Sequence, residues 1–149
     1  MTIPSPVAHT VQQTQEWLKE LRDMADLESE AAAFSMLKAV LHQLRDRLSM
    51  EEAVDLGAQL PVLVRGVYYE GWRPHRVPEK VRSKQKFLDE LTMKLLPHPI
   101  APEPAARDVF SLLAHHCDPG EIADVISQLP ADIKTLWPDT ARTFKARAS

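Results

Sequence analysis

The chain has 149 residues, of which 44% are hydrophobic and 26% are charged, with a formal net charge of −3. This composition is typical of a single globular domain with a substantial core, and its one cysteine excludes a disulfide scaffold. No apolar run is long enough to cross a bilayer, and the negative charge argues against a general polyanion binder. The N-terminal residues lack the basic start and apolar stretch of a signal peptide, so we expect a cytoplasmic protein.

The first half of the chain predicts three helices after a flexible N-terminal arm. The arm, residues 1–12, is rich in proline, serine and threonine. Apolar residues at helical spacing predict two helices after it. Ser49 can cap the amide of Glu52 and begin a third, which Pro61 breaks. The expected helices cover residues 13–25, 28–48 and 49–69.

The second half predicts three more helices, separated by two proline-containing connectors at residues 72–82 and 97–104. Asp118 and Pro119 form a helix start, and Pro130 breaks that last helix. No segment alternates polar and apolar residues over a useful length, so the expected fold class is all-α. The expected helices cover residues 84–96, 104–117 and 118–137.

An internal repeat relates the two halves. A shift of 69 residues places residues 38–68 on residues 107–137, so that the sequence Gln-Leu-Pro at 59–61 meets the same sequence at 128–130. The capping signals at Ser49 and Asp118 coincide under the same shift. We therefore expect six main helices, arranged as two three-helix repeats with pseudo-twofold symmetry in one bundle-like domain. The expected boundaries are 13–72 for repeat one, 84–138 for repeat two, 13–140 for the whole domain and 141–149 for a C-terminal tail.

Several strings of residues resemble a known family. They are Leu-Arg-Asp-Arg-Leu at 44–48, Ala-Gln-Leu-Pro at 58–61 and Tyr-Tyr-Glu-Gly-Trp at 68–72, followed by a proline-containing loop and Phe-Leu at 87–88. Over about residues 14–138 the chain resembles the bacterial domain-of-unknown-function family 2267. The resemblance implies a small bacterial all-α protein, and it implies no activity and no catalytic residue.

The residues offer little catalytic or metal-binding chemistry. His115, His116 and Cys117 are adjacent, but neighbouring helix residues point about 100° apart, so the two histidines are not expected to share an ion. Cys117 is expected to be a buried thiol. Two carboxylate pairs, Glu52 with Asp55 and Glu121 with Asp124, lack the histidines of a di-iron site. With no nucleophile elbow or phosphate loop, we expect no enzyme activity, no metal and no cofactor.

Residues 73–86 are unusually basic, with six Lys or Arg and one Glu. They could bind phosphate groups, or they could be a solvated loop that complements the acidic remainder of the chain. The aromatic and basic residues that end the third helix are expected to form either a corner of the core or a binding surface. The candidate binding residues are Arg65, Tyr69, Trp72, Arg73, Arg76 and Arg82.

The sequence therefore predicts a non-enzymatic module that acts through protein contacts or self-association. Its partner would be an unidentified protein or a second copy of the chain, and no membrane contact is expected. The alternative function is weak binding of nucleic acid or a phosphorylated ligand through the basic loop at residues 72–86; a nucleic-acid partner is the less favoured of the two, because the chain as a whole is acidic.

Overall fold

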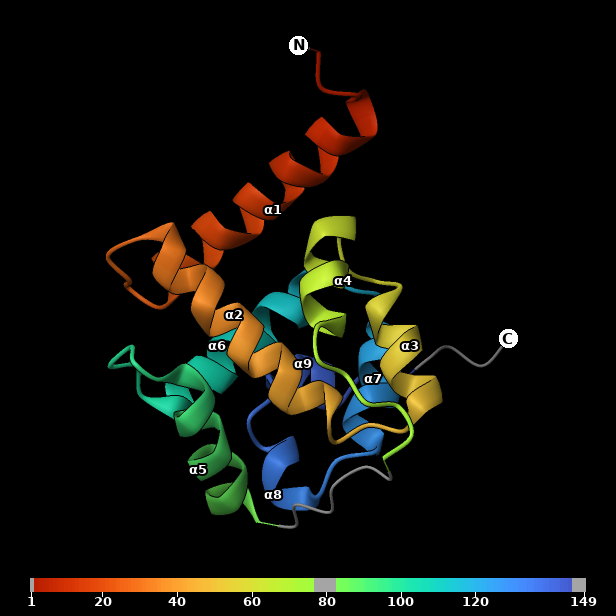
Figure 1. Ribbon diagram of the computed structural model, residues 1–149. Coiled ribbons are helices and arrows are strands. Elements are labelled where there is room, and N and C mark those ends of the chain that lie inside the picture. The colour runs from red at the N-terminus through yellow and green to blue at the C-terminus, as the bar shows by residue number, and fades with distance from the viewer. Residues whose placement is uncertain (1, 77–82, 146–149) are drawn as a thin grey trace.

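The computed structural model describes residues 2–76 and 83–145, and all regular structure in these ranges is helical. The all-α fold class is therefore confirmed. The helices of the described residues pack around one hydrophobic core (Figure 1). Their bounds are α1 (Ser5–Met24), α2 (Glu30–Arg45), α3 (Met50–Gly57), α4 (Val62–Tyr69), α5 (Lys84–Leu95), α6 (Pro102–His116), α7 (Pro119–Ser127), α8 (Ala131–Lys134) and α9 (Asp139–Arg142).

Two prolines explain why these ranges contain more helices than the six expected. Pro61 has φ −52° and ψ 146° and stands before the first residue of α4. Pro130 has φ −59° and ψ 152° and stands before the first residue of α8. Both conformations are extended. A proline has no amide hydrogen to donate to the preceding turn, so the helix before it ends there. Each expected break is thus a complete separation of two helices, and the short α9 is an additional element.

Helix α1 begins at Ser5, so residues 5–12 are helical rather than the flexible arm expected from their composition. Pro6 lies in the first turn, where a proline costs no hydrogen bond because the first amides of a helix have no intrahelical partner. The N-terminal half of α1 projects from the body of the molecule, whereas its C-terminal half packs on the domain (Figure 1). No helix in the described part of the chain has both the length and the apolarity needed to span a membrane.

Helix α2 is the centre of the fold. It contacts α1, α4, α5 and α6, and it is buried on more sides than a single apolar stripe would require. Two of its polar side chains are buried with partners. Gln43 Nε2 donates to the carbonyl of Phe87 at 3.1 Å, and Arg45 Nη1 donates to the carbonyl of Tyr68 at 2.7 Å. These bonds attach α5 and the end of α4 to α2.

Helices α3 and α7 begin with the side-chain caps that the sequence predicts. Ser49 Oγ accepts a hydrogen bond from the amide of Glu52 at 3.2 Å, and Asp118 Oδ2 accepts one from the amide of Glu121 at 3.1 Å. The two helices contact each other (Figure 1). The start of each helix lies beside the end of the other, because Ser49 contacts Gln128 and Asp118 contacts Gln59.

Candidate functional site

Arg65 makes hydrogen bonds to backbone carbonyls near the end of α3. Its Nε donates to the carbonyl of Gly57 at 2.9 Å, and its Nη2 donates to the carbonyl of Leu60 at 3.1 Å. These acceptors lie at the C-terminal end of α3 and just after it, where helix carbonyls have no intrahelical partner. Arg65 therefore fastens α4 to the end of α3.

Tyr69 and Trp72 form part of the same corner. Their rings stack with centroids 5.4 Å apart, and both side chains are partly buried against the core. Tyr68, which is fully buried, donates from its hydroxyl to the carbonyl of Ala53 at 2.7 Å. A Cβ added at Gly57 would lie 2.3 Å from the Tyr69 hydroxyl, so only glycine permits this packing. Of the two interpretations of this group, its contacts favour a corner of the core.

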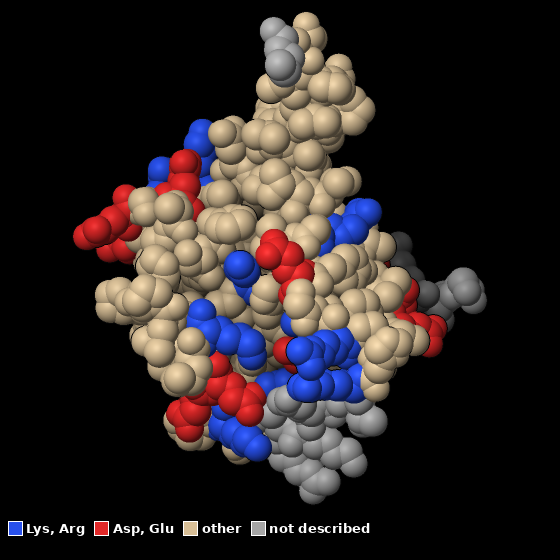
Figure 2. All heavy atoms as spheres, viewed as in Figure 1, with Lys and Arg blue, Asp and Glu red and all other residues tan. Residues whose placement is uncertain are grey.

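The basic segment is divided between exposed and paired residues. Arg73, Arg76 and Lys86 are exposed, whereas Lys84 pairs with Glu103 at 2.5 Å. Figure 2 shows Lys and Arg side chains on one face, with Asp and Glu side chains among them. Arg82, the sixth candidate residue, lies outside the described residues.

An exposed apolar surface lies where α1 meets α4, and sequence reasoning missed it. Val7 and Val11 on the projecting half of α1 are 48% and 40% exposed, and Val62 in the first turn of α4 is 64% exposed. The amide of Leu63 donates to Thr10 Oγ1 at 2.9 Å and joins the two helices at this point. We call Ile3, Val7, Val11, Val62 and Leu63 the α1–α4 surface.

The signal for this surface was present in the sequence. Val7, Val11, Thr14, Leu18 and Leu21 are spaced four, three, four and three residues apart, which is the spacing of a helix that packs along one stripe. The proline-rich composition of the first residues concealed this pattern. In the structure the C-terminal residues of this stripe, Thr14 and Leu21, are buried, whereas its N-terminal residues, Val7 and Val11, are exposed.

Carboxyl groups from α3 and α7 meet where these helices pack. Glu52 is only 9% exposed, and its ligand oxygen lies within 4.8 Å of those of Asp55 and Glu121. Burial, together with a hydrogen bond and charge repulsion from Glu121, raises the pKa of Glu52 to about 8. The sequence suggested two separate pairs, whereas the fold places the equivalent glutamates of the two halves beside each other.

Cys117 is buried, as the sequence predicts, and burial raises the pKa of its thiol to about 12. A thiol in this state is a poor nucleophile, because the thiolate is the reactive form. The neighbouring His115 and His116 have a partner that no sequence pattern revealed, because both contact the carboxylate of Glu20 on α1.

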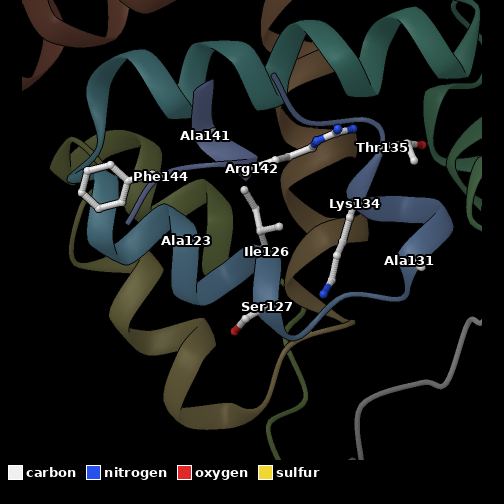
Figure 3. A pocket seen from close by; sticks show the side chains of 9 residues that line it. All are labelled: Ala123, Ile126, Ser127, Ala131, Lys134, Thr135, Ala141, Arg142 and Phe144. Carbon is white, nitrogen blue, oxygen red and sulfur yellow. The ribbon is translucent and has the colours of Figure 1, made fainter. Parts of the chain in front are cut away.

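Two surface pockets accompany these features. One, of about 260 Å³, lies beside the α1–α4 contact and includes Trp17, Pro61 and His116 among its walls. The other, of about 450 Å³, lies among α7, α8 and α9. In Figure 3 Ile126 lies at its centre, between Phe144 and the cationic side chain of Lys134. This second pocket therefore combines an apolar wall with a positive edge.

Comparison with known families identifies the chain. The profile of one family, described as "Uncharacterized conserved protein (DUF2267)", matches residues 14–136. A comparison with curated proteins gives no match. The matched region includes both halves of the fold, the α3–α7 contact and the corner at Arg65 and Tyr69. The chain therefore belongs to the DUF2267 family.

Proposed function

We propose that this protein is a non-enzymatic interaction module that self-associates into a homodimer through the α1–α4 surface. The observation that carries this proposal is that one apolar face of α1 continues from the part that packs on the domain into the part that projects from it. Thr14 and Leu21 on the stripe are buried by the same chain, whereas Val7 and Val11 on the next turns are exposed. A second copy of the chain would bury the exposed valines, just as the rest of the domain buries Thr14 and Leu21.

The charge distribution favours a second copy over a charged partner. Residues 2–15 contain no Asp, Glu, Lys or Arg, although a quarter of the whole chain is charged. Figure 2 shows the projecting part of the molecule free of both charge colours among its described atoms. A surface that faces a copy of itself meets its own charges, so an uncharged surface avoids like-charge repulsion.

The size of the surface predicts weak association. Complete burial of a Val or Leu side chain contributes about 1.5–3 kcal/mol, and part of the sum is offset by the freedom lost on association. The five residues of the surface are 36–64% exposed, so each contributes only part of that amount, and we expect a dissociation constant no tighter than the order of micromolar. Such a dimer would exchange with monomer at the concentrations used in solution experiments.

Sedimentation equilibrium over a concentration series tests the proposal. The wild-type chain should show a monomer–dimer equilibrium, and the double variant Val7→Glu/Val11→Glu should be monomeric over the same range. The matched control is His9→Glu/Gln12→Glu, which adds the same charge to the same helix away from the stripe and should dimerise as the wild type does. A wild-type chain that is monomeric throughout, or a control variant as impaired as the stripe variant, would contradict it.

We also infer that the domain consists of two three-helix repeats related by a pseudo-twofold axis. Helices α3 and α7 begin at residues 50 and 119, and helices α4 and α8 begin at residues 62 and 131, so both pairs are 69 residues apart. The matched caps and the similar backbone angles of Pro61 and Pro130 support the same relation. The proposal includes a bacterial origin and a cytoplasmic location, which the single buried thiol supports.

The second candidate function is weak electrostatic binding of nucleic acid or a phosphorylated ligand. The exposure of Arg73, Arg76 and Lys86 supports it. Contacts from such side chains to phosphate groups position a ligand without specifying a base sequence. Homodimerisation remains the first proposal because the negative net charge of the chain opposes binding to polyanions.

A further inference from the structure

Three side chains with metal-binding atoms converge where α1 meets the end of α6. His115 Nδ1 lies 2.6 Å from Glu20 Oε1, and His116 Nε2 lies 2.6 Å from Glu20 Oε2. One ligand atom from each residue lies within 4.8 Å of the others. The expectation that adjacent histidines diverge is wrong here, since their ring centroids are only 4.5 Å apart. His116 is the last residue of α6, and both rings turn toward α1 at the end of the helix.

The fold holds two of these groups in place. Trp17, one turn before Glu20 on α1, is buried and stacks on His116 with ring centroids 4.7 Å apart and an interplanar angle of 24°. Helices α1 and α6 also pack against each other. The side chain of His115, which is 67% exposed, can adjust its position. The position of His116 is thus fixed by packing, whereas His115 can move to complete the coordination of an ion.

The composition of the cluster selects one class of ion. Two imidazole nitrogens and one carboxylate oxygen suit zinc and the neighbouring divalent transition metals, which accept both nitrogen and oxygen ligands. Calcium and magnesium favour sites made wholly of oxygen atoms. Three protein ligands would leave further coordination positions for water or for an external group, and His116 also borders the pocket of about 260 Å³.

The carboxylate is already prepared for a cation. Burial alone would raise the pKa of Glu20, but hydrogen bonds from His116 and His115 outweigh it and hold the pKa below its usual value. Glu20 is therefore ionised near neutral pH.

We propose that Glu20, His115 and His116 form a binding site for a divalent transition-metal ion of the zinc type, which links α1 to the C-terminal end of α6. The proposal does not depend on homodimerisation, because the three ligands belong to one chain. A bound ion would hold the C-terminal half of α1 against the domain and so stabilise the folded state.

Titration of the chelator-treated protein with Zn²⁺ tests the site. Calorimetry should show one saturable site per chain, and Co²⁺ should give visible absorption bands when it binds there. Glu20→Gln, His115→Ala and His116→Ala should each weaken Zn²⁺ binding by at least about tenfold, as loss of a supporting residue alone does at many metal sites.

Matched controls distinguish this site from ordinary surface binding. Glu16→Gln and His9→Ala remove the same groups from exposed positions of the same helix, and Glu52→Gln alters the other cluster of metal-binding atoms. All three should bind Zn²⁺ as the wild type does. Zn²⁺ should also raise the melting temperature of the wild type but not of Glu20→Gln. A wild-type titration without a saturable phase would overturn the proposal, and so would unchanged binding by the near-isosteric Glu20→Gln variant.

Discussion

Gln59 and Gln128 make equivalent hydrogen bonds across the contact between α3 and α7: each accepts from the backbone amide of the residue that caps the helix of the other half. Gln59 Oε1 accepts from the amide of Asp118, the cap of α7, at 3.0 Å. Gln128 Oε1 accepts from the amide of Ser49, the cap of α3, at 3.0 Å. Each half of the chain thus fixes the helix start of the other half, and the two caps and two glutamines are the residues that the sequence repeat pairs.

This reciprocity predicts that both Gln59→Ala and Gln128→Ala reduce stability, with the larger loss for Gln128→Ala, because Gln128 Nε2 also donates to Ser49 Oγ at 3.2 Å. Each variant should lower the free energy of unfolding by about 0.5–1.5 kcal/mol, because each loses one side-chain hydrogen bond to a backbone amide. Urea unfolding monitored by circular dichroism measures the effect, with the exposed Gln12→Ala as the control. If only one of the two substitutions destabilised the protein, this prediction would be wrong.

The pH dependence of stability should reveal the raised pKa of Glu52. Between its usual pKa of 4.5 and the folded value of about 8, the folded state retains a proton that the unfolded state releases. The stabilisation is therefore complete below about pH 4.5 and declines as the pH rises toward 8. Glu52→Gln carries no titrating proton and should not show this decline.

At pH 8 to 9 the Glu52→Gln variant should exceed the wild type in stability by at least about 1 kcal/mol, since one unit of pKa shift corresponds to about 1.4 kcal/mol. Urea unfolding at several pH values measures the difference between the two proteins. The exposed neighbour Glu51 offers the control Glu51→Gln, which should follow the wild-type pH profile. If the free energy of unfolding changed with pH in the same way for wild type and Glu52→Gln, Glu52 would be ionised in the folded protein at neutral pH, contrary to this prediction.

The basic segment should bind polyanions weakly and in a salt-dependent way. Neutralising about six phosphate groups predicts a loss of affinity of roughly a thousandfold between 50 and 200 mM salt. Arg73→Gln/Arg76→Gln should reduce binding to a random duplex while leaving the melting temperature nearly unchanged, because exposed charges contribute little to stability. Fluorescence anisotropy measures the affinity, and Lys19→Gln is the control on α1. Binding that is insensitive to salt or to the double variant would contradict this interpretation.

Local signals in the sequence predicted most of the helical structure. The caps at Ser49 and Asp118 and the breaks at Pro61 and Pro130 depend on neighbouring backbone groups, so they can be recognised without knowledge of the fold. The start of α1 was misplaced because Pro6 was interpreted as a residue of a loop. It is equally suited to the first turn of a helix.

The candidate sites were harder to predict because they depend on contacts between distant residues. Glu20 lies 95 residues from His115, and no spacing rule connects a helix near the N-terminus to the end of α6. Arg65 was interpreted as a binding residue from its type, but its hydrogen bonds to backbone carbonyls could be assigned only from the structure. The pairing of Glu52 with Glu121 was closer to prediction, because equivalent residues can meet across a pseudo-twofold axis.

Intermolecular nuclear Overhauser effects measured on an equal mixture of ¹³C-labelled and unlabelled chains test the proposed dimer most directly. The account predicts intermolecular contacts from the methyl groups of Val7 and Val11 to residues of the α1–α4 surface in the other copy. These contacts should disappear in Val7→Glu/Val11→Glu and persist in His9→Glu/Gln12→Glu. Intermolecular contacts confined to other parts of the domain, or none at concentrations well above micromolar, would contradict self-association through this surface.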